Sequence, residues 1–145
     1  MSISRYTTSI DPDKTASEIA KMLSMHGASA VLTEYNREEG YVSSLSFKMF
    51  IGDQEALFRL PCNWQGVLEV FEEDLKMPKA NKTREQAVRT AWRIVRDWIE
   101  AQLAFIQSRQ VKVPQAFLAY VVMKDGQTLF EQISGNPHLL LGDGK

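Results

Sequence analysis

The sequence predicts an α+β protein in which a small antiparallel sheet of three to four strands, formed by the N-terminal half, packs against helices. Two observations carry this prediction. Residues 84–109 show the longest helical pattern and hold two of the three tryptophans, whereas residues 28–60 alternate between apolar and polar side chains as strands do. With 145 residues, the chain is expected to form one domain, residues 1–133, followed by a flexible tail, residues 134–145.

The long helix of the C-terminal half has a clear start and a wide apolar surface. Thr83 is a natural N-cap, and Gln86 follows at the spacing of a capping box, in which each side chain satisfies a backbone N–H group. Apolar side chains cover an arc of ~200°, about twice what a helix resting on one surface needs. We therefore expect neighbours on two sides of this helix, with Trp92 and Trp98 as principal core residues.

The rest of this helix carries both signs of charge. Its charged row comprises Glu85, Arg89, Arg93, Arg96, Asp97 and Glu100. Three opposite pairs lie four residues apart, a spacing that gives intrahelical ion pairs of ~0.2–0.5 kcal/mol each. We interpret the row as a solvated, charge-balanced face, in preference to a phosphate-binding ladder. Gln102 lies inside the apolar arc, where a core hydrogen bond is favoured for its amide and a ligand contact is the alternative.

Local signals place the elements of the N-terminal half. Residues 4–10 are β-prone and predict an edge strand. Asp11 followed by Pro12 starts a helix that Gly27 ends, with a cap at Thr15 as the alternative start. Further strands are predicted over residues 28–35, 41–51 and 54–60.

The hairpin between the last two strands is the best-determined part of the predicted fold. Gly52-Asp53 suits a two-residue type II′ turn. This turn pairs Met49 with Ala56, Phe47 with Phe58 and Leu45 with Leu60. All three pairs are apolar, so the turn and the hydrophobic pattern select the same register. The opposite face is mixed and includes Lys48 and Arg59; it is either partly covered by the C-terminal segment or a binding surface.

Three further elements follow the hairpin. Asn63 caps a second helix, whose apolar face comprises Val67, Leu68, Phe71 and Leu75. After residue 110, a helix over residues 113–121 and a hairpin across residues 124–126 are alternatives. A short element is then expected over residues 128–133.

Composition restricts the function classes. A net charge of −1 gives no general attraction to nucleic acid or to an anionic membrane. No apolar run approaches the ~18 residues of a membrane span and nothing resembles a signal peptide, so we expect a cytoplasmic protein without a membrane partner. Cys62 is the only cysteine, and the two histidines lie far from each other in sequence, so we predict no metal site and no cofactor.

Catalytic motifs are missing from the sequence. It contains no P-loop, GxGxxG, HExxH, GxSxG or paired-cysteine motif. We therefore assign no catalytic residue and expect a non-enzymatic protein, with an enzyme of unrecognised type as a less favoured hypothesis. The best candidate for an anion site is the basic start of the long helix, formed by Lys76, Lys79, Lys82 and Arg84. A candidate surface for nucleic acid or a nucleotide combines Lys79, Lys82 and Arg84 with Arg59 and Trp64.

Five segments of the chain read KTASEI, FRLP, AVRTAWRIVRDWIEAQLA, FLAY and DGQTLFE. Together they resemble segments of a family of small uncharacterised proteins encoded by phages, prophages and bacterial mobile elements. The resemblance covers nearly the whole chain and implies a small cytosolic accessory protein. It assigns neither an activity nor site residues.

Two functional hypotheses follow. The first is a protein that binds a host or phage protein, as an inhibitor or assembly factor, through the face that holds Lys48 and Arg59. The second is a nucleic-acid or nucleotide binder that uses the basic cluster. Homo-oligomerisation through the wide apolar arc of the long helix is compatible with both.

Overall fold

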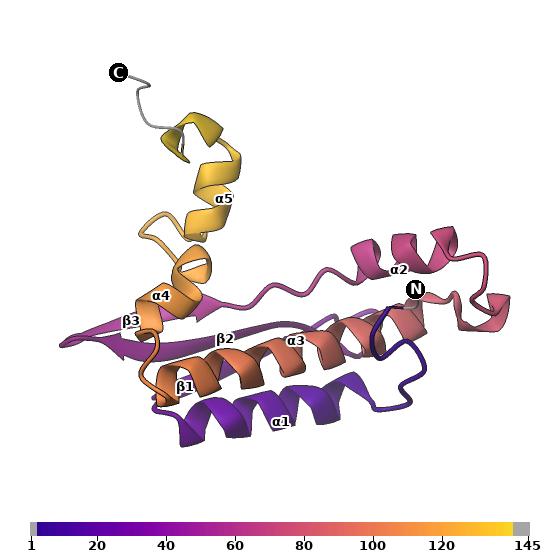
Figure 1. The fold of residues 1–145 in the computed structure, drawn as a ribbon, viewed down its shortest axis with the longest axis horizontal. Coiled ribbons are helices and arrows are strands. Elements are labelled where there is room, and N and C mark those ends of the chain that lie inside the picture. The colour runs from indigo at the N-terminus through magenta and orange to yellow at the C-terminus, as the bar shows by residue number, and fades with distance from the viewer. Residues whose placement is uncertain (1–2, 141–145) are drawn as a thin grey trace.

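Three antiparallel strands form the sheet, in the order β1 (Ala30–Tyr35), β2 (Val42–Ile51), β3 (Gln54–Arg59) (Figure 1). The computed structural model describes residues 3–140. Its helices are α1 (Pro12–Met25), α2 (Trp64–Glu73), α3 (Arg84–Gln107), α4 (Val113–Phe117) and α5 (Leu129–Ser134). Short 3₁₀ turns are η1 (Lys79–Asn81), η2 (Leu118–Tyr120) and η3 (Pro137–Leu140). The predicted α+β class is confirmed.

The predicted hairpin register is also confirmed. Met49 pairs with Ala56 and Phe47 pairs with Phe58, and the backbone N–H of Leu60 donates to the carbonyl oxygen of Leu45 at 2.9 Å. Gly52 has φ 63°, a left-handed conformation that glycine adopts without strain.

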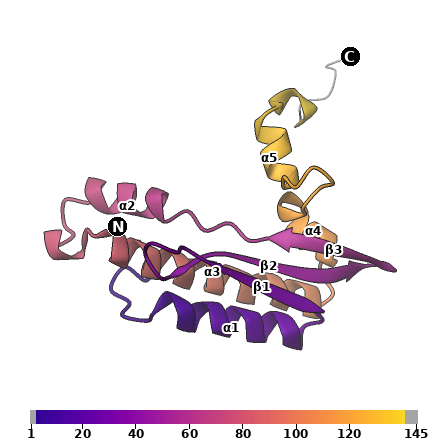
Figure 2. The same cartoon turned by 180° about the vertical axis from the view of Figure 1, so that it is seen from behind.

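Helices α1 and α3 cover one face of the sheet (Figures 1 and 2). The core between these helices and the sheet holds Phe47, Phe58, Phe117 and the buried side chains of α3. Trp92 is only 1% exposed, and its indole N–H donates to the carbonyl oxygen of Val42 at 3.3 Å. Trp98 is half-buried at the margin, where its ring meets that of Phe117 edge to face at 5.8 Å between centroids. Only Trp92 therefore has the central position expected for both tryptophans.

The N-terminal segment is not a strand, so the expectation for residues 4–10 is wrong. Polar side chains of α3 hold its backbone instead of a neighbouring strand. The Gln86 amide donates to the carbonyl oxygens of Tyr6 at 2.7 Å and Thr8 at 2.9 Å, and the Thr90 hydroxyl donates to that of Arg5 at 3.2 Å. Because the Gln86 side chain binds the N-terminal segment, it does not cap the helix, and only one half of the predicted capping box is present. In that half, the backbone N–H of Gln86 donates to the Thr83 hydroxyl oxygen at 3.1 Å.

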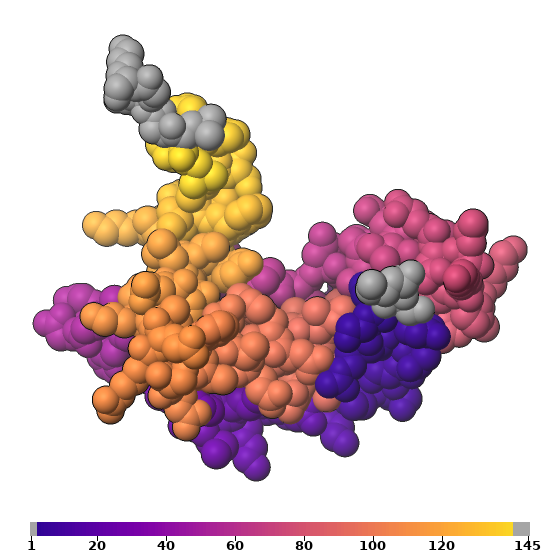
Figure 3. Space-filling model, in the orientation of Figure 1, coloured from indigo at the N-terminus to yellow at the C-terminus, as the bar shows by residue number. Residues whose placement is uncertain are grey.

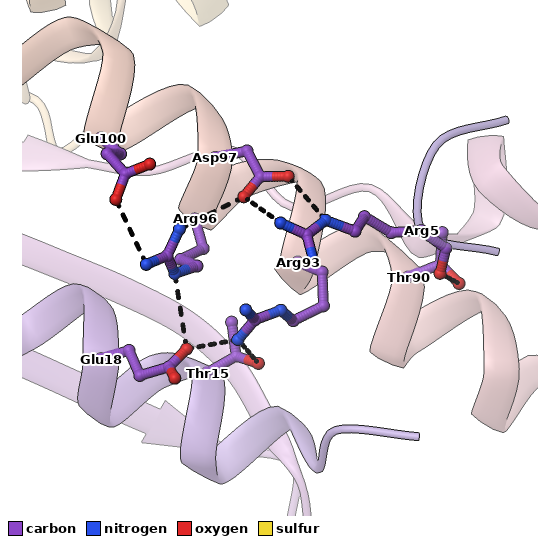
Figure 4. Close-up of polar contacts among 8 residues, drawn as sticks. All are labelled: Arg5, Thr15, Glu18, Thr90, Arg93, Arg96, Asp97 and Glu100. Carbon is purple, nitrogen blue, oxygen red and sulfur yellow. Dashed lines mark hydrogen bonds and ion pairs between the residues drawn. The ribbon is translucent and has the colours of Figure 1, made fainter. Parts of the chain in front are cut away.

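The middle of the charged row of α3 is a packed interface (Figure 4), which corrects its interpretation as a solvated face at Arg93, whereas Glu85 and Glu100 are exposed. Arg93 is 6% exposed and donates to Glu18 and, at 3.3 Å, to Thr15, both on α1. Arg93 does not pair with Asp97, which instead accepts two hydrogen bonds from Arg5.

Arg96 links the two helices at the edge of this interface. Its guanidinium lies 3.5 Å from Glu18 and 3.2 Å from Glu100. The Arg96–Glu100 pair is the one predicted intrahelical pair that forms within the described residues. The row therefore fastens α1 and the N-terminal segment to α3.

A second, smaller apolar cluster lies between α2 and the start of α3. Phe71, Met77 and Ala87 are its buried members. The predicted apolar face of α2 is wrong at Leu75, which is 95% exposed. The helix ends at Glu73, so the chain leaves the helical path before Leu75 can join that face.

Residues 118–140 form what we call the C-terminal arm, which stands out from the body at the end opposite α2 (Figure 3). Both alternatives for this region are partly realised, since a helical stretch over residues 113–120 precedes a turn closed by a bridge between Val122 and Thr128. Val121 also bridges to Phe58 of β3. Within the predicted tail, residue 134 belongs to α5 and residues 137–140 form η3, and the flexibility of the tail stays a prediction. Residues 141–145 of that tail lie outside the described part of the chain.

Candidate binding surface

One face of the sheet is covered by neither α1 nor α3, and we call it the bare sheet face (Figure 2). Its members are Ala30, Leu32, Glu34, Ser44, Ser46, Lys48, Phe50, Glu55, Leu57 and Arg59. They share this face because alternate residues of a strand point to the same side. The cross-strand register places Leu32, Ser46 and Arg59 in one row.

Large apolar side chains are exposed on the bare sheet face. Leu32 is 56% exposed and Phe50 is 53% exposed. Between them, the ammonium of Lys48 lies 3.9 Å from the carboxylate of Glu55. Sequence reasoning selected Lys48 but missed Leu32, although alternation along β1 could have found it on the same face as Glu34.

Arg59 holds the C-terminal arm against the sheet. Both of its terminal nitrogens donate to the carbonyl oxygen of Gly126 at 3.2 Å, and its guanidinium lies 3.6 Å from Glu131. Hydrogen bonds from the backbone and side chain of Thr128, followed by the charge of Arg59, lower the pKa of Glu131. The C-terminal segment thus covers one end of the mixed face, and Arg59 has a structural partner there.

The outer edge of β1 is open. The bond from Leu60 to Leu45 shows that odd-numbered residues of β2 bond to β3, so its even-numbered residues bond to β1. By the β1–β2 register, the backbone groups of Val31 and Thr33 then point away from the sheet. No described residue hydrogen-bonds to them from that side. Such an edge can receive a strand from another protein.

The second group of predicted site residues lies at the start of α3. The Arg84 guanidinium is placed over the Trp64 ring, 5.9 Å from its centroid, and also pairs with Glu39. Lys79 belongs to η1 and Lys82 follows it. The structure therefore brings Trp64 and Arg84 together, but a carboxylate already neutralises Arg84.

A polar hollow of about 300 Å³ lies beside this group. Its lining includes Glu39, Tyr41, Cys62, Trp64 and Trp92. Burial, followed by the hydrogen bond to Glu39, raises the pKa of Tyr41 to about 12. Burial alone raises the pKa of Cys62 to about 12. Neither group is ionised at neutral pH, so this hollow offers no nucleophile from them.

We expect the thiol of Cys62 to react slowly with iodoacetamide at pH 8 in the folded chain. The rise of its pKa from 9.0 to about 12 reduces the thiolate fraction about a thousandfold relative to an ordinary thiol. Mass spectrometry over time, in buffer and in denaturant, checks this. Equal alkylation rates under the two conditions would contradict the burial of the thiol.

Gln102 is half-buried on α3. Its side-chain amide forms no hydrogen bond with another described residue, so the expected core hydrogen bond is not seen. Its alternative role as a ligand contact stays a prediction. Within residues 3–140 there is no helix long and apolar enough to cross a membrane. The same residues contain no group of three or more His, Cys, Asp or Glu side chains placed to hold a metal ion.

No protein-family model, curated protein or solved structure matches the chain.

Proposed function

We propose that this chain is a non-enzymatic binding protein that engages a host or phage protein through the bare sheet face. The observation that carries the proposal is the exposure of Leu32 and Phe50 on a sheet face that the C-terminal arm contacts at its Arg59 end and that α1 and α3 leave uncovered. Exposed apolar side chains grouped on one face, with polar residues around them, are typical of protein interaction sites. The open edge of β1 adds backbone groups that a partner strand can pair with.

The charges of the bare sheet face favour a protein over a nucleic acid. Lys48 is matched by Glu55, and Glu34 adds a second carboxylate to the face. A nucleic-acid surface needs cations that are free to contact phosphates. Arg59 and Arg84, two of the five residues proposed for such contacts, are each engaged by a carboxylate of this chain.

The resemblance to proteins of phages and mobile elements supports a bacterial cell that carries such an element as the place where the partner is found. In that setting, we propose that the partner is a protein of the bacterium or of the element itself, and that the chain acts on it as an inhibitor or as an assembly factor. The role belongs to the proposal, and the bare sheet face is where we place the contact.

The test is site-specific photo-crosslinking in bacterial cells that express the chain. Benzoyl-phenylalanine replaces Leu32 in one variant and Lys21, an exposed residue of α1, in the control. We expect a protein adduct at residue 32 that is absent at residue 21 and that mass spectrometry can identify. Identical adducts at the two positions, or co-purified oligonucleotide in place of a protein adduct, would contradict the proposal.

Substitution of the same face gives a quantitative measurement with the partner identified in this way. Leu32→Asp is expected to weaken binding at least tenfold, or about 1.4 kcal/mol, because an apolar contact becomes a buried carboxylate. The thermal midpoint should stay unchanged, since Leu32 contributes an exposed side chain. Lys21→Glu is the control, and equal effects of the two variants would contradict the assignment of the contact to the sheet.

A further inference from the structure

An apolar groove lies where the β2–β3 hairpin meets the link between α3 and α4. Its volume is about 650 Å³. The hairpin contributes Phe50 and Ile51, and the helical side contributes Ile106, Val111 and Pro114. Phe50 also belongs to the bare sheet face, so the groove continues that face around the end of the hairpin.

Two cations line this otherwise apolar groove. They are Arg109 and Lys112, and the nine lining residues include no carboxylate. Both cations are exposed, and neither forms an ion pair with any residue between 3 and 140. The groove therefore combines apolar walls with positive charge that the described chain does not neutralise.

Arg109 occupies a position that usually belongs to glycine. Its φ is 64°, in the left-handed region that side chains with a Cβ rarely adopt. The backbone N–H of Arg109 donates to Ile106 at 3.0 Å and that of Gln110 donates to Phe105 at 3.1 Å, which is the Schellman pattern that ends helices at glycine. The chain thus keeps a strained arginine at the groove where glycine would fit better.

Between residues 3 and 140, one other non-glycine residue has a positive φ, and it shows what such backbone strain can accompany. Arg5 has φ 68°, and its guanidinium makes a paired contact with Asp97. Strained residues that persist often serve a contact that the conformation makes possible. For Arg109, the matching carboxylate is not among the described residues.

We propose that this groove binds an acidic segment of the protein partner, with a bulky apolar side chain of that segment in the groove and its carboxylates on Arg109 and Lys112. The inference rests on the proposed function, because the segment is taken to belong to the same partner. Charge complementarity carries the choice of occupant, since the groove has two cations without an ion-pair partner among residues 3–140 and no carboxylate in its lining. Apolar walls supply the anchor site that a peptide side chain requires.

The experiment selects peptides from a random displayed library on the full chain and measures the synthetic winners by fluorescence anisotropy. We expect enrichment of Asp or Glu next to Leu, Phe or Trp. The double variant Arg109→Glu, Lys112→Glu should weaken their binding at least about tenfold, because it places carboxylates against carboxylates. Enrichment of neutral or basic peptides, or equal affinity for the double variant, would overturn the proposal.

A second variant keeps the test independent of folding defects. Arg109→Gly is expected to raise the thermal midpoint by about 2–4 °C, because glycine relieves the left-handed strain. The same variant should lose peptide affinity, since it removes a guanidinium from the groove. A stabilised variant that binds the peptides as tightly as the parent chain would overturn the role of Arg109.

The outcomes separate this inference from the proposed function. In one outcome, Leu32→Asp abolishes the binding of the selected peptides and the Arg109, Lys112 double variant leaves it unchanged. This result would overturn the groove assignment and leave the bare sheet face as the contact. In the opposite outcome, peptide binding requires the groove cations, but crosslinking at residue 32 yields no protein adduct in cells. This result would contradict the proposed contact at the sheet and support the chemistry of the groove.

Discussion

Replacing Trp92 with Ala is expected to lower the free energy of unfolding by about 3–5 kcal/mol. The side chain is 1% exposed and lies in the main core, and its loss also leaves the carbonyl oxygen of Val42 without its indole donor. This is a large part of the ~5–15 kcal/mol that stabilises a typical domain. Chemical denaturation followed by circular dichroism measures the change.

Trp98→Ala is the matched control for this substitution. Its ring is half-buried and contacts Phe117 and Tyr120 edge to face, so less apolar surface is lost and the destabilisation should be clearly smaller. Equal losses for Trp92→Ala and Trp98→Ala, or a change below about 1 kcal/mol at Trp92, would mean that the core is not centred where the structure places it.

The second large effect is expected from Glu18→Ala, which leaves the guanidinium of Arg93 buried without a carboxylate. Breaking a buried ion pair by removing one partner costs about 3–5 kcal/mol. Because Glu18 is about one-third exposed, water can partly replace it, and we expect about 2–4 kcal/mol. Thr15 remains as a neutral acceptor for Arg93.

Two variants test this explanation by denaturation in low and high salt. Glu100→Ala removes the exposed partner of Arg96 and should change stability by less than about 0.5 kcal/mol. The double replacement Glu18→Leu, Arg93→Met removes both charges and should restore most of the stability lost in Glu18→Ala. A double variant as unstable as the single one would show that packing, and not the unpaired charge, causes the loss.

The sequence was sufficient for elements whose causes are local. The hairpin is the clearest case, because the turn at Gly52 and the apolar pairs on either side of it select one register within a few residues. The same holds for α1, where Asp11 caps the helix and Gly27 ends it. Alternation along β2 and β3 also placed Lys48 and Arg59 on one face, which the structure confirms.

Features that depend on a distant partner could not be predicted in this way. A helical wheel showed Arg93 among charged neighbours, but it could not show that Glu18 lies opposite on another helix. Residues 4–10 were β-prone, yet side chains of Gln86 and Thr90 bind their backbone and leave no strand. Arg59 is proposed from the sequence for contact with a partner or with phosphates, whereas its hydrogen-bond acceptor Gly126 lies 67 residues away in sequence.

The small cluster around Phe71 is expected to unfold as a cooperative unit separate from the main core. Helix α2 packs mainly on α3, and the cluster shares no buried residue with the core beneath the sheet. Local opening costs less free energy than global unfolding where few contacts must break, and of the residues packed around the two clusters only Trp64 belongs to both. We therefore expect residues 64–82 to exchange their amide hydrogens, and to be cleaved by proteases, before the strands of the sheet do.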